Sequence, residues 1–230
     1  MTAEAAAHID AVPRGFALDA RRGALVVIDM QHDFLSTGGW IDALGLDVGL
    51  LAPVTTVVAS LIAATRRAGV QIVYTREGYR ADLADCPPLK RARGVPPIGA
   101  AGPRGRHMIQ GEPGNAIVPQ LAPQDGDIVI DKPGAGAFHA TLLDQILRLR
   151  GITHLMVCGV TADVCVNATL YEANDRGYEC LLIADATGSY DHYSTPAVIT
   201  MVANGVIGCT APAVAVIAAL DTLSAARPRP

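Results

Sequence analysis

Short apolar runs alternate with longer segments of helical spacing along most of this chain. The runs are rich in valine, isoleucine and leucine and are bounded by turn residues, which is typical of parallel strands buried on both faces. The predicted strands cover residues 24–28, 70–75, 127–131, 154–159, 178–184 and 206–209. The predicted helices cover residues 50–68, 138–150, 165–175, 192–204 and 213–223. This alternation predicts an α/β fold with one doubly wound, mostly parallel sheet of about six strands, flanked by helices on both faces.

The chain length of 230 residues fits a single domain of this class. We expect an N-terminal extension over residues 1–22, the domain itself over 23–223, and a frayed tail over 224–230. The extension carries acidic residues and lacks a sustained apolar core, so it does not resemble a signal peptide. We also expect no apolar run of the roughly 18 residues that a membrane span needs, and hence no membrane partner.

A long segment between the second and third predicted strands is dense in glycine and proline. Residues 76–123 include the pairs Pro87-Pro88 and Pro96-Pro97. This density excludes long helices, and long ordered loops in compact domains are usually functional. We therefore interpret residues 76–123 as a cover over an active site.

Composition narrows the classes of function. Hydrophobic residues make up 50% of the chain but aromatic residues only 4%, so the core must be mainly aliphatic. The net charge is −4 and no stretch gathers lysine and arginine, which argues against nucleic acid as a partner. The five cysteines include no CxxC pair, which argues against a disulfide scaffold or a zinc ribbon and fits a reducing, cytoplasmic location.

Three chemically active residues each follow a predicted strand: Asp29, Lys132 and Cys165. In open α/β sheets the ligand crevice lies outside the carboxyl ends of the strands, so these side chains are expected to meet there. Cys165 is predicted at a helix N-terminus, where unpaired N–H groups favour the thiolate and can hold an oxyanion. Asp29 can take the thiol proton as general base, and Lys132 can hold the aspartate and the developing charge.

Each of these residues taken alone has a plain structural interpretation. A buried cysteine is usually a small hydrophobe, an aspartate can cap a loop, and a lysine is usually solvated. The three together at strand ends favour nucleophilic catalysis.

The trio resembles that of the isochorismatase-like cysteine hydrolase superfamily, and the resemblance covers about residues 22–210. Within the superfamily, three continuous segments are similar to biuret hydrolases and the related triuret hydrolases. They are residues 74–85, 111–114 and 172–180.

The resemblance implies covalent catalysis without metal or other cofactor. Cys165 would attack a carbamoyl carbon, ammonia would leave with a proton returned through Asp29, and water would hydrolyse the acyl-enzyme. It also implies a cis peptide bond between Val160 and Thr161, which aims the N–H groups of Thr161 and Cys165 at one oxyanion. Members of the family commonly form homotetramers, so a homo-oligomer is expected.

The resemblance and the residue types suggest four substrate contacts. Phe34 matches a family position that packs against substrate, although core packing would explain it equally well. Glu77 and Arg80 could hydrogen-bond the N–H and C=O groups of a urea unit, although a loop ion pair is the alternative. Where biuret hydrolases carry a substrate-contacting glutamine, this chain has Ala203 or Asn204, which leaves room for a longer ureide.

A metal site is not expected. Asp29, His32 and Asp33 are acceptable ligand types, but metal-binding relatives such as nicotinamidases carry an Asp-x-His signature after the second strand. This chain has Thr75-Arg76-Glu77 there instead.

These observations predict a metal-independent cysteine amidohydrolase that hydrolyses a terminal carbamoyl C–N bond of a small-molecule ureide, triuret or biuret, and releases ammonia. The alternative substrates are other carbamoyl compounds, ureidoacrylate or an N-carbamoyl amino acid. Cleavage of a vinyl ether, as in isochorismatase itself, would not need the cysteine. A non-catalytic binding protein on the same fold is a further alternative, but it would be expected to lose at least one of Asp29, Lys132 and Cys165.

Overall fold

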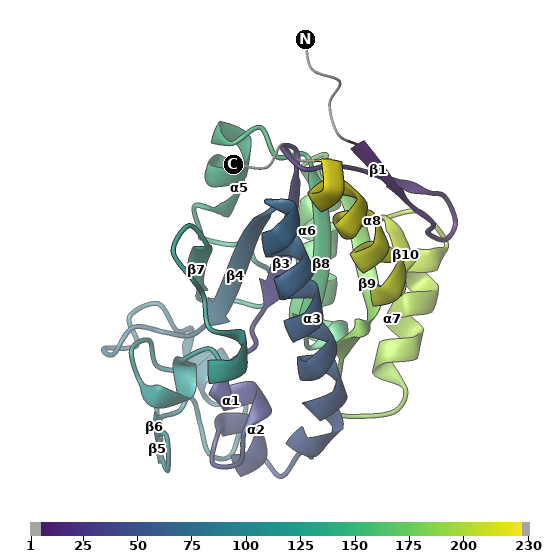
Figure 1. The fold of residues 1–230 in the computed structure, drawn as a ribbon. Coiled ribbons are helices and arrows are strands. Elements are labelled where there is room, and N and C mark those ends of the chain that lie inside the picture. The colour runs from purple at the N-terminus through teal and green to yellow at the C-terminus, as the bar shows by residue number, and fades with distance from the viewer. Residues whose placement is uncertain (1–5, 227–230) are drawn as a thin grey trace.

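The computed structural model describes residues 6–226. Its centre is a six-stranded sheet in the order β10-β9-β8-β3-β4-β7, and every neighbouring pair is parallel (Figure 1). The predicted doubly wound fold is thus confirmed. The strands are β3 (Gly23–Ile28), β4 (Gln71–Glu77), β7 (Ile128–Lys132), β8 (His154–Val160), β9 (Glu179–Gly188) and β10 (Cys209–Ala211).

The strand order reverses between β3 and β8. From β3 the chain builds outward through β4 to β7, then returns to place β8 on the other side of β3 and builds outward again. The crevice at such a switch point, beyond the carboxyl ends of the strands, is the usual ligand site of this architecture. The residues that follow β3 and β8 are therefore the first candidates for a functional site.

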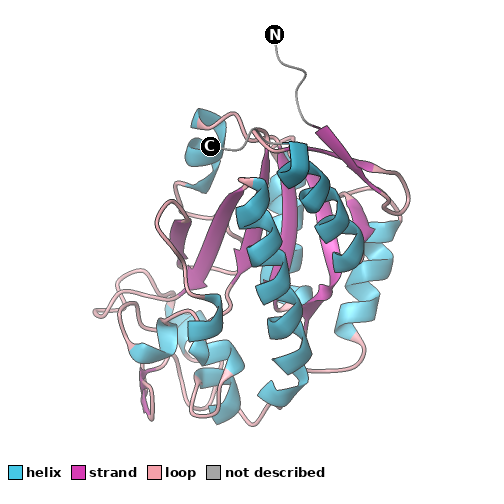
Figure 2. Ribbon diagram, in the orientation of Figure 1, coloured by secondary structure: helices cyan, strands magenta, loops and turns pink. Residues whose placement is uncertain are grey.

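Helices cover both faces of the sheet (Figure 2). The helices α3 (Ala52–Ala68) and α8 (Ala213–Ala226) share one apolar cluster with half of the strand side chains. The helices α5 (Leu143–Leu149), α6 (Asn167–Asp175) and α7 (Ser194–Ala203) share the other. Strand β3 is apolar throughout because both of its faces are buried. Leu25 and Val27 lie in the first cluster, and Val26 and Ile28 lie in the second.

One apolar helical stretch contradicts the expectation about membrane spans. Val48–Ala68, a 3-10 turn followed by α3, has 21 residues and a mean hydropathy of 1.9, long and apolar enough to cross a bilayer by length and composition. Core helices of globular domains meet the same two criteria. Here Val58 and Leu61 are fully buried in the cluster beneath the helix, so we interpret the stretch as a core helix.

Several predicted boundaries are wrong. Helix α5, predicted over 138–150, begins at Leu143, because residues 137–141 form a turn held by side chains of α6. The last strand begins at Cys209 rather than 206, where it pairs with β9. Helix α8 continues to Ala226, so the predicted frayed tail is wrong for residues 224–226, and residues 227–230 lie outside the described part.

The described part of the N-terminal extension is folded onto the domain. Its antiparallel strands β1 (Ala6–Ile9) and β2 (Phe16–Asp19) form a hairpin. Ile9, Phe16 and Leu18 are buried in the same apolar cluster as α8. The hairpin therefore contributes three buried side chains to the hydrophobic core.

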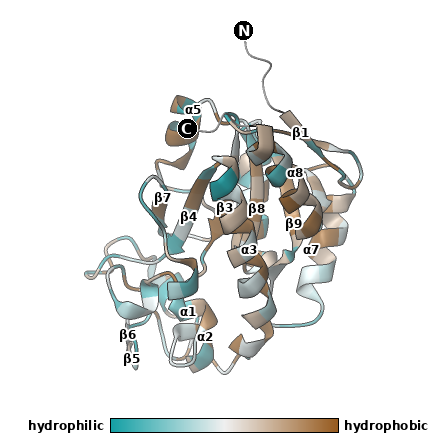
Figure 3. Ribbon diagram, viewed as in Figure 1, coloured by the Kyte–Doolittle hydropathy of each residue, from teal (hydrophilic) through white to brown (hydrophobic). Residues whose placement is uncertain are grey.

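The segment predicted as a cover contains short elements and lies beyond the carboxyl ends of β3 and β4, beside the short helices α1 (His32–Leu35) and α2 (Trp40–Ala43) (Figure 1). Asp33 ties the two regions together, because its carboxylate accepts from the backbone N–H groups of Met108 at 2.9 Å and Trp40 at 3.1 Å. In Figure 3 the segment around β5 and β6 is mainly pale or teal, in contrast to the brown strands. The elements of the cover are α4 (Pro88–Arg91), β5 (Ala101–Gly102), β6 (Gly105–Arg106) and the 3-10 turns Pro113–Asn115 and Pro119–Leu121.

Candidate active site

Four strands deliver charged or nucleophilic side chains to one place. Asp29 directly follows β3, Glu77 ends β4, and Lys132 ends β7. Cys165 lies in a π-helical turn, Ala162–Val166, directly after β8 and before α6. One potential ligand atom each of Asp29, Glu77 and Cys165 lies within 4.8 Å of the others. The structure therefore brings together the three residues predicted to react, and adds Glu77.

The ammonium group of Lys132 holds the two carboxylates. Its Nζ lies 2.7 Å from Asp29 Oδ2 and 3.4 Å from Glu77 Oε2. It also donates to the backbone carbonyls of Gly134 at 2.8 Å and Ala135 at 2.9 Å. The side chains of Lys132 and Asp29 are fully buried, so this is a desolvated ion pair with its donors directed by the protein.

Glu77 connects this ion pair to Cys165. The thiol of Cys165 donates to Glu77 Oε2 at 3.3 Å. The other carboxylate oxygen, Oε1, lies 3.1 Å from Lys90 Nζ and accepts from the hydroxyl of Tyr79 at 3.4 Å. Glu77 thus contacts the thiol on one side and a second ammonium group on the other.

Backbone geometry at Asp29 fixes the direction of its carboxylate. Its φ is +48°, in the left-handed region that a non-glycine residue seldom adopts and that aspartate tolerates better than most. The hydroxyl of Thr75 accepts from Asp29 N–H at 3.2 Å and donates to Asp29 Oδ1 at 2.6 Å. Such conformations cluster at functional sites, where surrounding contacts hold them.

A side-chain amide fixes the backbone of Glu77 in the same way. Gln31 Oε1 accepts from Glu77 N–H at 2.7 Å, and Gln31 Nε2 donates to Glu77 O at 3.0 Å. Asn115, from the cover, donates to the same carbonyl at 3.0 Å. The cover therefore also helps to position the site.

The turn that carries Cys165 is tight. The peptide bond between Val160 and Thr161 is cis, as the family resemblance implies. The Thr161 carbonyl accepts from Val164 N–H at 3.3 Å and Val166 N–H at 3.0 Å, which closes the turn beneath the cysteine. Gly159, with φ of +113°, is required just before it, because a Cβ there would collide with the Ile28 carbonyl of β3.

Burial reverses the expectation that Cys165 rests as a thiolate. Desolvation raises the pKa of the Cys165 thiol well above its usual value, although the nearby Lys132 ammonium acts to lower it. The cysteine also lies in the turn before α6 rather than at the first residue of a regular helix. The raised pKa favours the thiol, and the predicted attack by Cys165 would then be coupled to transfer of the proton to a base.

The charges of the neighbouring groups are set by burial and by one another. Burial raises the pKa of Asp29 above the usual carboxyl range, against the lowering effect of Lys132. Burial alone would also raise the pKa of Glu77, but Lys132 and Lys90 together lower it. For Lys132 burial acts to lower the pKa, and the anionic neighbours, Asp29 first among them, raise it. Two carboxyls with pKa values pushed in opposite directions are a common arrangement for acid–base work.

Two of the predicted substrate contacts are not retained. Arg80 is exposed, and its guanidinium pairs with Asp82 at 3.2 Å. Asn204 follows α7 and lies near the amino-terminal ends of the strands, away from Cys165. There its Oδ1 accepts from Val206 N–H at 3.0 Å. Because α7 carries the chain back across the sheet, Asn204 cannot fill the role of a glutamine at the carboxyl edge, and the argument for room for triuret fails with it.

The other two predicted substrate contacts are Glu77 and Phe34. Glu77 lies in the cluster with Asp29, Lys132 and Cys165. Phe34 is buried in the apolar cluster on the α3 side, and its carbonyl accepts from the hydroxyl of Tyr190 at 2.8 Å. The structure thus gives Phe34 a packing role, and its contact with substrate remains a prediction.

Sequence reasoning missed Lys90 and Thr75. Thr75 carries a usable signal, because it lies two residues before Glu77 on β4 and therefore shares its side of the strand. Lys90 lies in the irregular cover, where no periodicity indicates the direction of a side chain.

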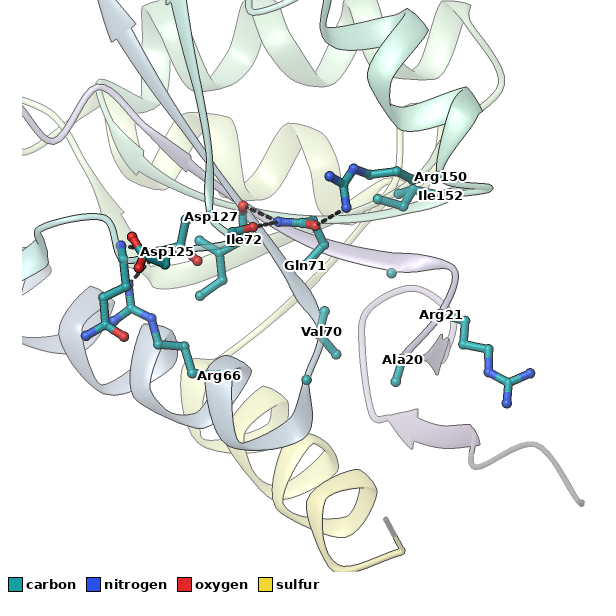
Figure 4. A pocket seen from close by; sticks show the side chains of 14 residues that line it. Ala20, Arg21, Arg66, Val70, Gln71, Ile72, Asp125, Asp127, Arg150 and Ile152 are labelled. Carbon is teal, nitrogen blue, oxygen red and sulfur yellow. Dashed lines mark hydrogen bonds and ion pairs between the residues drawn. The ribbon is translucent and has the colours of Figure 1, made fainter. Parts of the chain in front are cut away.

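A cavity of about 510 Å³ lies at the opposite, amino-terminal edge of the sheet, near the starts of β3, β4 and β8 (Figure 4). Its lining pairs Arg66 with Asp127 at 2.6 Å and Arg150 with Gln71 at 2.9 Å. None of Asp29, Lys132 and Cys165 lines it. We place the candidate active site at the carboxyl edge because the predicted nucleophile, base and cation meet there.

Fold and site together define a cysteine hydrolase of the α/β class, and sequence comparison specifies it further. A family model for the isochorismatase domain matches residues 23–213, and the chain belongs to that family. The predicted enzyme class, a hydrolase acting on linear amide C–N bonds, is confirmed by the family and by the relatives below.

Two curated relatives carry the same name, ureidoacrylate amidohydrolase RutB. The protein from Yersinia enterocolitica is 34% identical over 190 residues, which cover 78% of this chain and 80% of the relative. The protein from Methylorubrum extorquens is 34% identical over 193 residues, which cover 79% and 76%. The superfamily predicted from sequence is therefore right.

Solved structures agree with the fold. A cysteine hydrolase from Pseudomonas syringae pv. phaseolicola superposes with a TM-score of 0.79 over 93% of this chain and 98% of that one, at 24% identity. The N-carbamoylsarcosine amidase from Thermoplasma acidophilum superposes with a TM-score of 0.66 over 84% and 96%, at 26% identity.

Proposed function

We propose that this protein is a metal-independent cysteine amidohydrolase that hydrolyses the carbamoyl C–N bond of a small ureido compound, with ureidoacrylate as the leading substrate. The observation that carries the proposal is the buried contact of the Cys165 thiol with Glu77, whose carboxylate shares the Lys132 ammonium with Asp29. Nucleophile, base and cation are within reach of one substrate carbon.

The proposed reaction has two halves. In the first, Cys165 Sγ bonds to the carbamoyl carbon as its proton passes to the buried carboxylate pair, and that proton then leaves with the departing ammonia. The cysteine is left carrying the rest of the substrate as an N-substituted S-thiocarbamate. In the second half, Asp29 takes a proton from water, the hydroxide attacks the thiocarbamate carbon, and the proton returns to sulfur as the N-substituted carbamate, which still carries the acid, leaves.

The oxyanion formed in each half needs donors that do not themselves move. We assign this role to the backbone N–H groups of Thr161 and Cys165, on the two sides of the tight turn after β8. The closed turn from Thr161 to Val166, which carries both N–H groups, supports this assignment. Preorganised donors of this kind usually make a major contribution to the rate of acyl transfer.

The names of the relatives favour a ureido acid as the substrate, rather than the biuret or triuret predicted from the sequence. Both curated relatives described above carry ureidoacrylate in their name. The solved amidase at 26% identity acts, by its name, on another carbamoyl compound that is also an acid, N-carbamoylsarcosine. Biuret and triuret keep the same carbamoyl group, but the position of Asn204 removes the reason for favouring them.

A substrate screen tests the proposal. Ammonia release should be measured with ureidoacrylate, N-carbamoyl amino acids, biuret, triuret, nicotinamide and maleamate, with kcat/KM determined for each. We expect ureidoacrylate to give the highest kcat/KM and nicotinamide the lowest. A best substrate without a carbamoyl group would contradict the proposal, and so would the absence of turnover with every compound.

We predict that metal chelation leaves activity unchanged. Asp29, Glu77 and Cys165 offer three potential ligand atoms. The Lys132 ammonium, however, already lies 2.7 Å and 3.4 Å from the two carboxylates, and Lys90 lies 3.1 Å from Glu77. A divalent cation would have to displace or repel these ammonium groups. Dialysis against EDTA followed by the ammonia assay checks this. Loss of activity that zinc or manganese restores would contradict it.

A further inference from the structure

Lys90 brings a second cation to the charge cluster, from a short helix of the cover. It lies on α4, and its Nζ is 3.1 Å from Glu77 Oε1 and 5.3 Å from the centre of the Tyr79 ring. Its side chain is 29% exposed, whereas that of Lys132 is fully buried. The cluster therefore has an inner ammonium group beside Asp29 and an outer one that reaches solvent.

The outer ammonium group lies close to the reacting sulfur. The two oxygens of the Glu77 carboxylate separate them: Oε2 is 3.3 Å from Cys165 Sγ, and Oε1 is 3.1 Å from Lys90 Nζ. In a ureido acid only a few bonds separate the carbamoyl carbon from the carboxylate. A substrate whose carbamoyl group meets Sγ can therefore place its carboxylate at Lys90.

An ammonium group has three N–H donors. Among the described residues, Lys90 Nζ makes its polar contact with Glu77, and the ring of Tyr79 covers a second direction. A donor can thus meet a substrate carboxylate while the contact with Glu77 persists. The partial exposure of Lys90 keeps the desolvation cost of that second contact low.

The charges of the cluster agree with a role for Lys90 in binding a substrate carboxylate. Asp29 and Glu77 are matched by Lys132 and Lys90, and the thiol of Cys165 is neutral. Without an outer cation, a substrate carboxylate would approach two buried carboxylates with only one ammonium group between them. Lys90 is therefore placed to make an anionic substrate acceptable at a site that needs Asp29 as a base.

We infer that Lys90 is the specificity residue for a substrate carboxylate, so that this site selects ureido acids over neutral ureides. The inference rests on the proposed function, because it assigns the outer half of the same substrate. Glu77 then has two roles: it meets the thiol, and it holds the ammonium group that binds the acid.

The test compares ureidoacrylate with its methyl ester, which has the same skeleton without the charge. Activity is measured by ammonia release in the full-length wild type and in Lys90→Gln, Lys90→Arg and Arg91→Gln. Arg91 is a matched control, because it is exposed on the same short helix and its substitution removes the same formal charge. If the ester turns over too slowly, its inhibition constant against ureidoacrylate replaces kcat/KM.

We expect Lys90→Gln to lower the ratio of kcat/KM for the acid to that for the ester by roughly 10- to 100-fold, mainly through KM, as loss of a charged hydrogen bond implies. Lys90→Arg should restore most of the ratio, and Arg91→Gln should leave it within about threefold of wild type. An equal loss for acid and ester, with a shifted pH profile, would mean that Lys90 acts only through Glu77, and would overturn the inference. A wild type inactive on both compounds would instead refute the proposed function.

Discussion

Replacing Cys165 with serine is expected to lower kcat by more than about a thousandfold without unfolding the protein. The thiol is buried, and desolvation raises its pKa, so the chemistry depends on handing the proton to the carboxylates as sulfur attacks. A serine hydroxyl is a far weaker acid and nucleophile, and the distance of 3.3 Å to Glu77 is set for sulfur. The substitution is small, so the apolar contacts of the turn persist.

The measurement is steady-state ammonia release, with circular dichroism as the check on folding. Cys158→Ala is the matched control, because Cys158 is equally buried, in β8, and makes no contact with the charge cluster in the described residues. Mass spectrometry of the wild type quenched during turnover should show an adduct on Cys165 with the mass of the substrate minus ammonia. A serine variant that kept most of the wild-type kcat would refute covalent catalysis by sulfur.

Much of this site follows from the sequence because of how parallel sheets are built. Asp29 and Lys132 stand at the ends of apolar runs, and the ends of neighbouring parallel strands meet at one edge. The order of the strands decides which of them are neighbours. It places β3, which Asp29 follows, between β4, which ends at Glu77, and β8, which precedes the turn with Cys165.

The sequence predictions that the structure does not support have equally specific causes. Similarity along the chain favours a substrate contact for Asn204, but a helix of ten residues separates it from the carboxyl edge of the sheet. A position before a helix favours the thiolate of Cys165, but the desolvation of a fully buried thiol outweighs that effect. Both errors concern burial and direction in space, which a local pattern does not contain.

The cover is the part least accessible to prediction from sequence. Its irregular backbone has no period from which the direction of a side chain could be inferred, so nothing in the sequence distinguishes Lys90 from an ordinary surface residue. What fixes the cover are contacts made far along the chain, such as Asp33 with Met108 and Gln31 with the backbone of Glu77. These contacts turn a segment rich in glycine and proline into one wall of the site.

Asp29→Asn should reduce kcat/KM at least about a hundredfold, the lower end of the usual contribution of a general base. The amide keeps the shape of the side chain and can still contact Thr75, but it cannot accept the proton of the Cys165 thiol. It also removes the anionic partner that lies 2.7 Å from Lys132 Nζ. The loss should therefore fall on kcat, with ureidoacrylate still bound.

The dependence of activity on pH distinguishes loss of the base from a general disturbance of the site. Burial raises the pKa of Asp29, whereas Lys132 and Lys90 lower that of Glu77, so Asp29 is the carboxyl that loses its proton at the higher pH. Wild-type kcat/KM should rise with pH as Asp29 ionises, along a limb that lies above the ordinary carboxyl range. Asp29→Asn should abolish this limb. Asp33→Asn, which removes another buried carboxylate that anchors the cover, should lower thermal stability but keep the limb. If the limb survived in Asp29→Asn, the base would be Glu77 instead.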